Sequence, residues 1–403
     1  PMQAFDGIRV IDLTRVLAGP YASYQLALLG ADVVKVERVG TGESTRWRSE
    51  GDAQMASLGM SPSFITQGSN KRSLTLDLDS AEGQAVFLRL VASADVVVEN
   101  LRTGSMDRRN IGYAAARKLK PGIIYCSMTG YGQTGPKARY PAYDSVIQAA
   151  CGFMSVTGTP ESGPLKSGPP VVDYAMGLAG AFAISAALFQ RQRTGEGQHI
   201  DLSMQDSALA LMSSVMTSYL HSGKTPTLRG NEAPSRSPAS TTFDTRDGQL
   251  AIAINEQHQF EHLMQTVGLG DWLADPRFGD AALRREHTPL LRQGIQDALT
   301  KKSAAEWEDL LNAAGVPAAR VVTIPEFIDT VQAPSKDFFH HFSAEASGVG
   351  RDITVPLAAF RFTTDGPRAH TPPPRVGQGA DDILQGLGYS EADIAALRDS
   401  KVV

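Results

Sequence analysis

The segment FDGIRVIDLTRVLAGPYASYQLALLGADVVKVER (residues 5–38) contains two apolar runs separated by a longer stretch with helical spacing. Residues 5–13 predict a strand, the following stretch predicts a turn and a helix, and residues 31–38 predict a second strand. A strand, a helix and a strand within about 35 residues are typical of a right-handed parallel unit. This segment therefore indicates an α/β fold.

Strands and helices continue to alternate downstream of this segment. This alternation predicts a doubly wound domain, in which ligands bind beyond the carboxyl ends of the strands. Further strands are predicted within 70–80, 95–100, 122–132 and 197–204, and helices within 81–92, 105–118 and 205–220.

The residues expected at these strand ends are rich in glycine and carry positive charge. They include 16–18, 100–102 and 130–135, together with Arg38 and Arg102. Each cation alone is most often a solvated surface residue, but together they suit a ligand with several phosphates, which needs distributed positive charge. We therefore expect a large anionic ligand at this edge. The other basic residues in or beside predicted loops are Lys71, Arg72, Arg108, Lys137 and Arg139.

A second informative stretch is PPVVDYAMGLAGAFAISAALFQRQRTGEGQ (169–198), in which Asp173 precedes the uncharged residues 174–190. Its apolar spacing and its many glycines and alanines predict a buried helix that another backbone approaches closely. Asp173 is expected at the N-cap of this helix. Such a residue is either only a cap or a reactive carboxylate, whose ionised form a helix N-terminus favours. Both interpretations are open at this point.

Composition argues against several classes of function. The 403 residues carry a net charge of −5, which argues against a nucleic-acid partner. No stretch of about 18 uncharged apolar residues is flanked for a membrane, so we expect no membrane span. Two cysteines, Cys126 and Cys151, and the lack of a typical signal peptide predict a cytoplasmic protein with free thiols. The histidines form no metal motif, and no GxGxxG motif follows the first strand. A Ser-His-Asp triad is open, although a GxSxG motif is absent.

Composition changes near residue 221. Residues 221–240 are polar and rich in proline and serine, which predicts a linker or a crossing segment. The residues after it predict a hairpin with Asp247-Gly248 at its turn, three helices between 257 and 313, and a strand at 315–323. We expect a smaller α+β domain here. The tail predicts a strand pair in 352–362 and a closing helix at 380–399.

Six ordered segments carry a family resemblance: LTRVLAGPYASYQLALLGADVVKVER (13–38), NKRSLTLDL (70–78), VVVEN (96–100), GYGQTGP (130–136), YPAYD (140–144) and the Asp173 helix through RTGEGQHIDLSMQD (193–206). Together they resemble the class III CoA-transferase family, also called CaiB/BaiF, which includes formyl-CoA transferase and carnitine CoA-transferase. The resemblance implies a large Rossmann-like, doubly wound domain formed by both chain ends (1–224 and 331–403). It also implies a small α+β middle domain (225–330) and an interlocked homodimer.

The same resemblance implies roles for individual residues. Asp173 matches the family's catalytic aspartate, which attacks an acyl-CoA thioester and passes through a mixed anhydride and an aspartyl-CoA thioester. Acyl-CoA and a small carboxylic acid would be the partners, with CoA thioesters as substrates and no permanently bound cofactor. The residues implied to contact CoA are Leu17, Ala18, Arg38, Leu74, Asn100, Arg108, Lys137, Arg139 and Tyr143.

The nearest alternative within this superfamily is an α-methylacyl-CoA racemase or isomerase. Those enzymes use a His-Asp pair to exchange the α-proton, and the corresponding pair here reads Tyr143-Asp144. A tyrosine with an ordinary pKa near 10 is a poor base for this proton, so the departure favours transfer. A CoA-binding protein without catalysis is the other alternative.

The sequence says less about the acid substrate than about the transfer reaction. Residues 229–243 (RGNEAPSRSPASTTF) look like family members that use dicarboxylic acids such as succinate. A dicarboxylate has a distal carboxylate for which the bidentate fork of an arginine is suited. The candidates for this role are Arg46, Arg48, Arg229 and Arg236, which are otherwise ordinary surface arginines.

Overall fold

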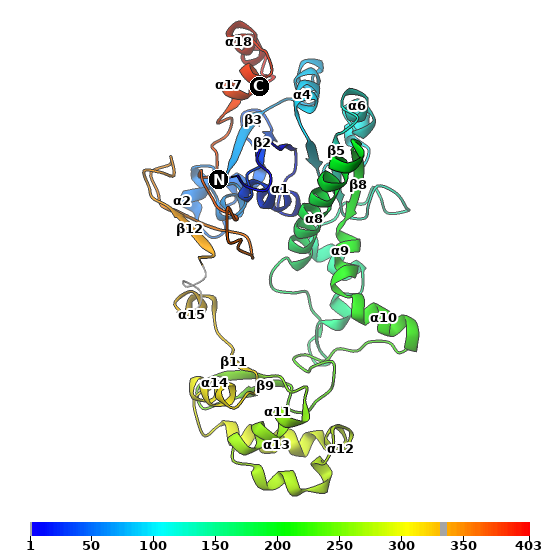
Figure 1. Cartoon of the computed structure of the whole chain (residues 1–403), viewed down its shortest axis with the longest axis vertical. Coiled ribbons are helices and arrows are strands. Elements are labelled where there is room, and N and C mark those ends of the chain that lie inside the picture. Colours follow the sequence, from blue (N-terminus) through cyan, green and yellow to red (C-terminus); the bar gives the residue numbers. More distant parts are fainter. Residues whose placement is uncertain (1, 331–336) are drawn as a thin grey trace. The chain divides into compact units, whose positions relative to one another are not determined.

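The computed structural model describes residues 2–330 and 337–403 (Figure 1). These residues form two compact units, the first made of 2–154, 166–225 and 337–403, and the second of 155–165 and 226–330. The sequence places 155–165 in the large domain, whereas the structure groups this segment with the second unit. One reason is a backbone hydrogen bond, 2.7 Å long, from Gly230 N–H to the Gly158 carbonyl.

The first unit contains a six-stranded sheet in the order β3-β2-β1-β4-β5-β8, and every neighbouring pair is parallel. The order reverses between β1 and β4, which is where doubly wound folds bind ligands. The α/β fold predicted from residues 5–38 is confirmed. The strands are β1 (Arg9–Asp12), β2 (Asp32–Glu37), β3 (Lys71–Thr75), β4 (Val96–Glu99), β5 (Ile124–Thr129) and β8 (Gln198–Ser203).

Helices pack on both faces of this sheet. Val10 and Ile11 are neighbours on β1 and enter different core clusters, because successive side chains of a strand point to opposite faces. Burial of such a side chain contributes roughly 1.5–3 kcal/mol, so the two faces hold the sheet between their helices. On the Val10 face lie α1 (Ala18–Leu28) and α8 (Val171–Thr194); on the Ile11 face lie α4 (Ala81–Ser93), α6 (Tyr113–Leu119), α17 (Ala380–Gly386) and α18 (Glu391–Asp399).

Helix α8 is longer than the predicted 173–190 and begins earlier. Its N-cap is Pro170, so Asp173 is the third helical residue, and the prediction of Asp173 as N-cap is wrong. The predicted close approach of another backbone is confirmed. A Cβ atom added to Gly177 would lie 2.9 Å from the carbonyl oxygen of Ala18 on α1, which leaves room only for glycine there.

Three predicted elements are divided differently in the structure. Residues 205–220 form two helices, α9 (Met204–Leu211) and α10 (Ser213–Ser222). The closing segment also forms two helices, because Gly388 has a φ of +87° and Ser390 caps α18. Residues 352–362 supply one strand, β13 (Ile353–Pro356), whose antiparallel partner is β12 (Phe339–Phe342).

The second unit has its own sheet and core. Its antiparallel sheet has the order β11-β10-β9, and the predicted turn at Asp247-Gly248 connects β9 to β10. The core joins Phe243 and Leu250 of the sheet to Trp307 of α14. The elements are β6 (Gly158–Thr159), β7 (Gly163–Pro164), β9 (Thr241–Asp244), β10 (Gln249–Ile252), α11 (Gln257–Thr266), α12 (Ala281–Glu286), α13 (Thr288–Leu299), α14 (Ala304–Ala313), β11 (Ala318–Arg320) and α15 (Ile324–Ile328).

Short helices complete the elements of residues 2–330 and 337–403. The α-helices are α2 (Ala53–Ser57), α3 (Pro62–Ile65), α5 (Ser105–Arg108) and α7 (Asp144–Ala150). The 3₁₀ turns are η1 (Ser44–Trp47), η2 (Met154–Val156), η3 (Gly270–Ala274) and η4 (Pro276–Phe278).

Candidate active site

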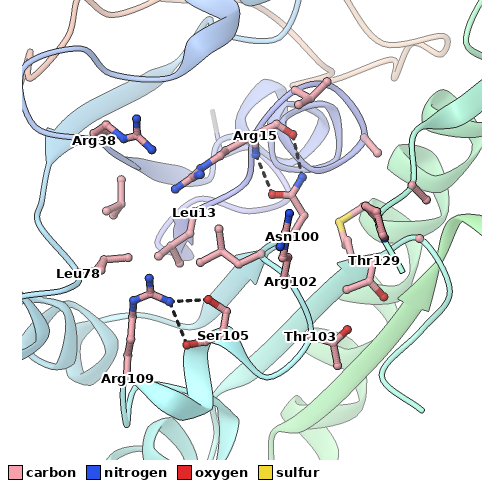
Figure 2. Close-up of a pocket in the computed structure, with 18 of the residues that line it drawn as sticks. Leu13, Arg15, Arg38, Leu78, Asn100, Arg102, Thr103, Ser105, Arg109 and Thr129 are labelled. Atoms are coloured by element: carbon pink, nitrogen blue, oxygen red, sulfur yellow. Dashed lines mark hydrogen bonds between the residues drawn. The ribbon is translucent and has the colours of Figure 1, made fainter. Parts of the chain in front are cut away.

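A cavity of about 850 Å³ lies beyond the carboxyl ends of the parallel strands in the first unit (Figure 2). Its walls come from the β1–α1 loop, the end of β2, the β4–α5 loop, the segment after β5, and the first turn of α8. This is the switch-point position at which doubly wound folds bind ligands. The cavity therefore lies where the strand ends predicted a ligand.

The lining of the cavity is strongly basic. Burial lowers the pKa of Arg15, and the neighbouring charge of Arg38 lowers it further, so the guanidinium groups are crowded around a common space. Such crowding is unfavourable until an anion arrives. The basic residues that line the cavity are Arg15, Arg38, Arg102, Arg108, Arg109, Arg139 and Lys401.

The cavity brings together most of the residues implied to form the site. Two of the implied residues lie elsewhere: Leu74 is fully buried in the hydrophobic core, and the Lys137 ammonium lies 5.6 Å above the ring of Tyr131. The side chain of Leu74 is thus unable to contact a ligand, so its predicted role is wrong. The residues that do line the cavity are Asp173, Leu17, Ala18, Arg38, Asn100, Arg108, Arg139 and Tyr143.

Three basic lining residues were missed at the level of sequence. Arg15 lies three residues after the end of β1 and Arg109 follows Arg108, so both had a positional signal. No signal in the sequence indicated Lys401, because only the tertiary structure brings the end of the chain to this cavity.

Asn100 has a role beyond lining the cavity. Its side-chain oxygen accepts from Arg15 N–H at 2.9 Å, and its side-chain nitrogen donates to the Arg15 carbonyl at 2.8 Å (Figure 2). The side chain therefore ties the β1–α1 loop to the end of β4.

Two cations expected beside the ligand are instead paired within the fold. The Lys71 ammonium lies 3.1 Å from the carboxylate of Asp12, and both side chains are buried. Arg72 pairs with Asp32 at 2.7 Å, at the amino end of β2. Neither lines the cavity, so their expected contribution to ligand binding is wrong.

Arg46 is also unavailable to a substrate. Its guanidinium pairs with Glu37 at 2.6 Å, lies over the ring of Phe64 and is fully buried. The suggestion that Arg46 binds a distal carboxylate is therefore wrong. Arg48 and Arg236 are exposed and Arg229 is half-buried.

Asp173 occupies the first turn of α8 and lines the cavity. Its environment is shaped by Asp144 of α7. One oxygen of Asp144 accepts from the backbone N–H groups of Val172, at 2.8 Å, and Asp173, at 3.0 Å. Asp144 therefore caps α8 from another helix.

The electrostatic consequence is opposite to the one expected from a helix N-terminus. Burial and then the charge of Asp144 raise the pKa of Asp173 to about 7. The N–H groups that would favour an ionised Asp173 are hydrogen-bonded to Asp144 instead. The carboxyl group is consequently poised near neutral pH, where a catalytic group both gains and loses charge readily.

A serine–histidine pair is present but lies outside the cavity. Ser127 Oγ is 2.9 Å from His199 Nε2, yet Ser127 is buried within the sheet and does not line the cavity. A buried serine cannot reach a substrate, so this pair does not support nucleophilic catalysis. Among residues 2–330 and 337–403, no cluster of three or more candidate ligands could hold a metal ion.

Comparisons with known proteins identify the family of the chain. The sequence model of CoA-transferase family III matches residues 5–380. The chain is 35% identical to succinate–glutarate CoA-transferase of Agrobacterium fabrum over 95% of both chains. It is 36% identical to acetyl-CoA:oxalate CoA-transferase of Acetobacter aceti over 84% of this chain and 85% of the relative.

The fold agrees with a solved structure as well. A CAIB/BAIF family protein from Brucella suis superimposes with a TM-score of 0.82 at 31% identity, covering 96% of this chain and 100% of that one. The family match extends over nearly the whole chain, and the relatives are matched along most of their length. The chain therefore belongs to CoA-transferase family III and is a class III acyl-CoA:carboxylate CoA-transferase.

Proposed function

We propose that this protein transfers CoA from succinyl-CoA to a short carboxylic or dicarboxylic acid, with Asp173 as the covalent nucleophile. The observation that carries the proposal is that Asp173 lines the same cavity as seven basic side chains. A CoA ester carries several phosphates at one end and a thioester at the other. The arginines suit the phosphates, and Asp173 is the carboxylate that the thioester can meet.

The reaction proceeds in two half-reactions. The ionised Asp173 attacks the thioester carbonyl and expels CoA thiolate, which leaves a mixed anhydride. The thiolate then attacks the aspartyl carbonyl, forming an aspartyl-CoA thioester and releasing the first acid. The acceptor carboxylate attacks this thioester, and the expelled thiolate takes the new acyl group, which regenerates Asp173. No net proton or electron is required.

The raised pKa of Asp173 suits this chemistry. A carboxylate with a pKa near 7 is a stronger nucleophile than an ordinary one, yet it is still ionised in a large fraction of molecules at neutral pH. Met128, Met176 and Met204 line the cavity with apolar atoms and help keep water from the anhydride.

The choice of a dicarboxylic acid rests on the relatives. Their names include succinate–glutarate, succinyl-CoA:mesaconate and succinyl-CoA:D-citramalate CoA-transferases. Arg46 is excluded by burial. Arg48, Arg229 and Arg236 do not line the cavity of the first unit, so a role for them at the distal carboxylate stays a prediction from the sequence.

We further propose that the protein is a cytoplasmic, interlocked homodimer. Leu178, Phe182 and Phe189 form an apolar stripe on the outer side of α8 and are 50%, 77% and 60% exposed. A second copy of the chain is the partner that the family resemblance implies for this stripe.

By length and composition α8 could also cross a membrane, but its inner side is buried against the sheet. Both cysteines are free, as suits a reducing compartment.

The proposal is tested by trapping the intermediate. We expect succinyl-CoA followed by borohydride to label Asp173, and Asp173→Ala to abolish both the label and CoA exchange. A panel of succinyl-, acetyl- and formyl-CoA donors against several acids, read by mass spectrometry, identifies the substrates. Full exchange by Asp173→Ala contradicts the mechanism, and deuterium entering the α-position without an acceptor acid indicates a racemase instead.

A further inference from the structure

Val16, in the loop between β1 and α1, has an unusual backbone conformation. Its φ is +73°, in the left-handed region, where a β-branched side chain is strongly disfavoured. Of the non-glycine residues with positive φ in the described part of the chain, Val16 is the only β-branched one. It also lines the cavity that contains Asp173. Strain of this kind persists only where the surrounding structure holds it.

Two side chains hold the backbone of Val16 from distant parts of the chain. The Val16 N–H donates to Glu43 Oε1 at 2.7 Å, and the Val16 carbonyl accepts from Gln67 Nε2 at 3.0 Å. Both backbone polar groups of Val16 are thereby fixed by specific partners. Glu43 follows β2, and Gln67 lies between α3 and β3.

Glu43 is in turn held by a buried cation. Its other oxygen lies 2.6 Å from Lys35 Nζ, and both side chains are at most 3% exposed. Burial alone lowers the pKa of Lys35, but Glu43, Asp12 and Glu37 together raise it, so the ammonium stays charged. The ammonium also donates to the Thr14 carbonyl at 3.0 Å, in the same loop as Val16.

Such a pair is not explained by stability. Burial of two charges costs desolvation, and an apolar pair of the same volume is often as stable or more stable. The pair instead makes hydrogen bonds to the loop: Lys35 donates to the Thr14 carbonyl, and Glu43 accepts from the Val16 N–H. It lies directly beneath a wall of the cavity, since residues 15–18 all line that cavity.

The position of this wall matters for the reacting groups. Leu17 and Ala18 follow Val16, and Ala18 begins α1. The Ala18 carbonyl faces Gly177 of α8, one turn after Asp173, at a distance that admits no side chain. A change of φ at Val16 would therefore move the wall relative to the helix that carries Asp173.

We infer that Glu43, held by Lys35, is a positioning residue for the transfer reaction: it fixes Val16 in the left-handed conformation and so sets the cavity wall formed by residues 15–18. One readout of this inference, kcat/KM for CoA exchange, rests on the proposed transfer through Asp173. The other readout, the φ of Val16 in a crystal structure, is independent of that proposal.

The test isolates the hydrogen bond from the charge. Lys35→Met/Glu43→Gln removes both charges and keeps an oxygen that accepts from the Val16 N–H. Lys35→Met/Glu43→Leu removes that acceptor as well. Arg9→Met is the control for lost stability, because it breaks the ion pair with Asp32 at the amino ends of the strands, away from the cavity.

We expect kcat/KM for CoA exchange to be at least about tenfold lower in the Leu double variant than in the Gln double variant, because small misplacements are costly in rate. Addition of Val16→Gly to the Leu double variant should restore most of this loss, since glycine adopts a positive φ without steric cost. Urea unfolding of the same variants separates this rescue from a change in stability, since glycine relieves the backbone strain but also increases the entropy of the unfolded chain.

Three results overturn the inference: equal kcat/KM in the two double variants, no rescue by Val16→Gly, or a crystal structure of the Leu double variant in which Val16 keeps its positive φ. If the double variants do not fold, Val16→Pro leaves the ion pair intact but fixes a negative φ and removes the N–H. Retained kcat/KM in a folded Val16→Pro enzyme then overturns it.

Failure of the proposed function gives a different pattern. The wild-type protein then performs no exchange with any acid, and the readout becomes the Kd of CoA itself, measured by calorimetry. Weaker CoA binding by the Leu than by the Gln double variant supports the positioning role, and equal binding by the two overturns it.

Discussion

The carboxylate of Asp144 accepts a hydrogen bond from the backbone N–H of Asp173 at 3.0 Å, so two acidic residues meet at the start of α8. The cap occupies the donors of the helix end, and its negative charge acts on the Asp173 side chain. Burial and this neighbour raise the pKa of Asp173 to about 7. The proposed nucleophile therefore titrates near neutral pH.

The first half-reaction should be lost as the pH falls through about 7, because only the ionised Asp173 attacks a thioester. We expect the single-turnover rate of succinate release from succinyl-CoA to rise sigmoidally with pH and to level off above that value. Rapid-quench measurement of the released succinate gives the profile. A rate that stays constant down to pH 5 contradicts the assignment of Asp173 as a group with a raised pKa.

Replacement of the charge on Asp144 should shift this profile. Asp144→Asn keeps an oxygen that caps Val172 and Asp173 but removes the negative charge, so the pKa of Asp173 should fall by about one unit. The rate profile then moves to lower pH by the same amount.

Asp144→Ala serves as the matched comparison for this shift. It removes the cap as well, which costs about 0.5–2 kcal/mol of stability in addition. An unshifted profile in Asp144→Asn shows that Asp144 does not influence the nucleophile.

Leu74 and Arg109 should separate stability from binding. Leu74→Ala opens a cavity in the core and should cost about 2–5 kcal/mol in urea unfolding, with an unchanged KM for acyl-CoA. Arg109→Ala should raise that KM about tenfold with little loss of stability, because a charged hydrogen bond to the ligand is removed. Lys137→Ala is the control with an unchanged KM. A raised KM for acyl-CoA in Leu74→Ala would indicate that Leu74 contacts the ligand despite its position in the core.

The outer stripe of α8 should hold two copies of the chain together. Phe182 is 77% exposed in the single chain, and Phe182→Glu places a charge in the centre of the stripe. We expect light scattering to show a dimer for the wild-type protein and a shift towards monomer for Phe182→Glu. Phe360→Glu, at another exposed phenylalanine, is the control that stays dimeric. A wild-type monomer contradicts the proposal.

Secondary-structure elements that depend on local sequence pattern could be predicted. Burial and ion pairing, which depend on residues distant in the sequence, could not. The strand–helix–strand pattern of 5–38 predicted β1, α1 and β2, because period and turn residues are local properties. The buried state of Arg46 and Lys71 was not predictable, since Glu37 and Asp12 meet them only after the strands pair. Asp173 was misplaced as a cap because the true cap, Asp144, is brought from another helix.

Removal of the Asp173 charge should stabilise the fold, and this prediction does not depend on activity. The pKa of a carboxyl group that is higher in the folded than in the unfolded state disfavours folding once the pH exceeds the unfolded value near 3.9. This penalty grows up to the folded value of about 7 and then remains constant.

Asp173→Asn should therefore unfold at the same urea concentration as the wild type near pH 4, and should be more stable by up to about 4 kcal/mol near pH 8. Asp206→Asn, a change in the first turn of α9 outside the cavity, should show no such dependence on pH. Equal stability of Asp173→Asn and wild type at both pH values would mean that the folded protein imposes no cost on the ionised carboxylate. The nucleophile would then owe its reactivity to the cations and the cavity wall rather than to its own burial.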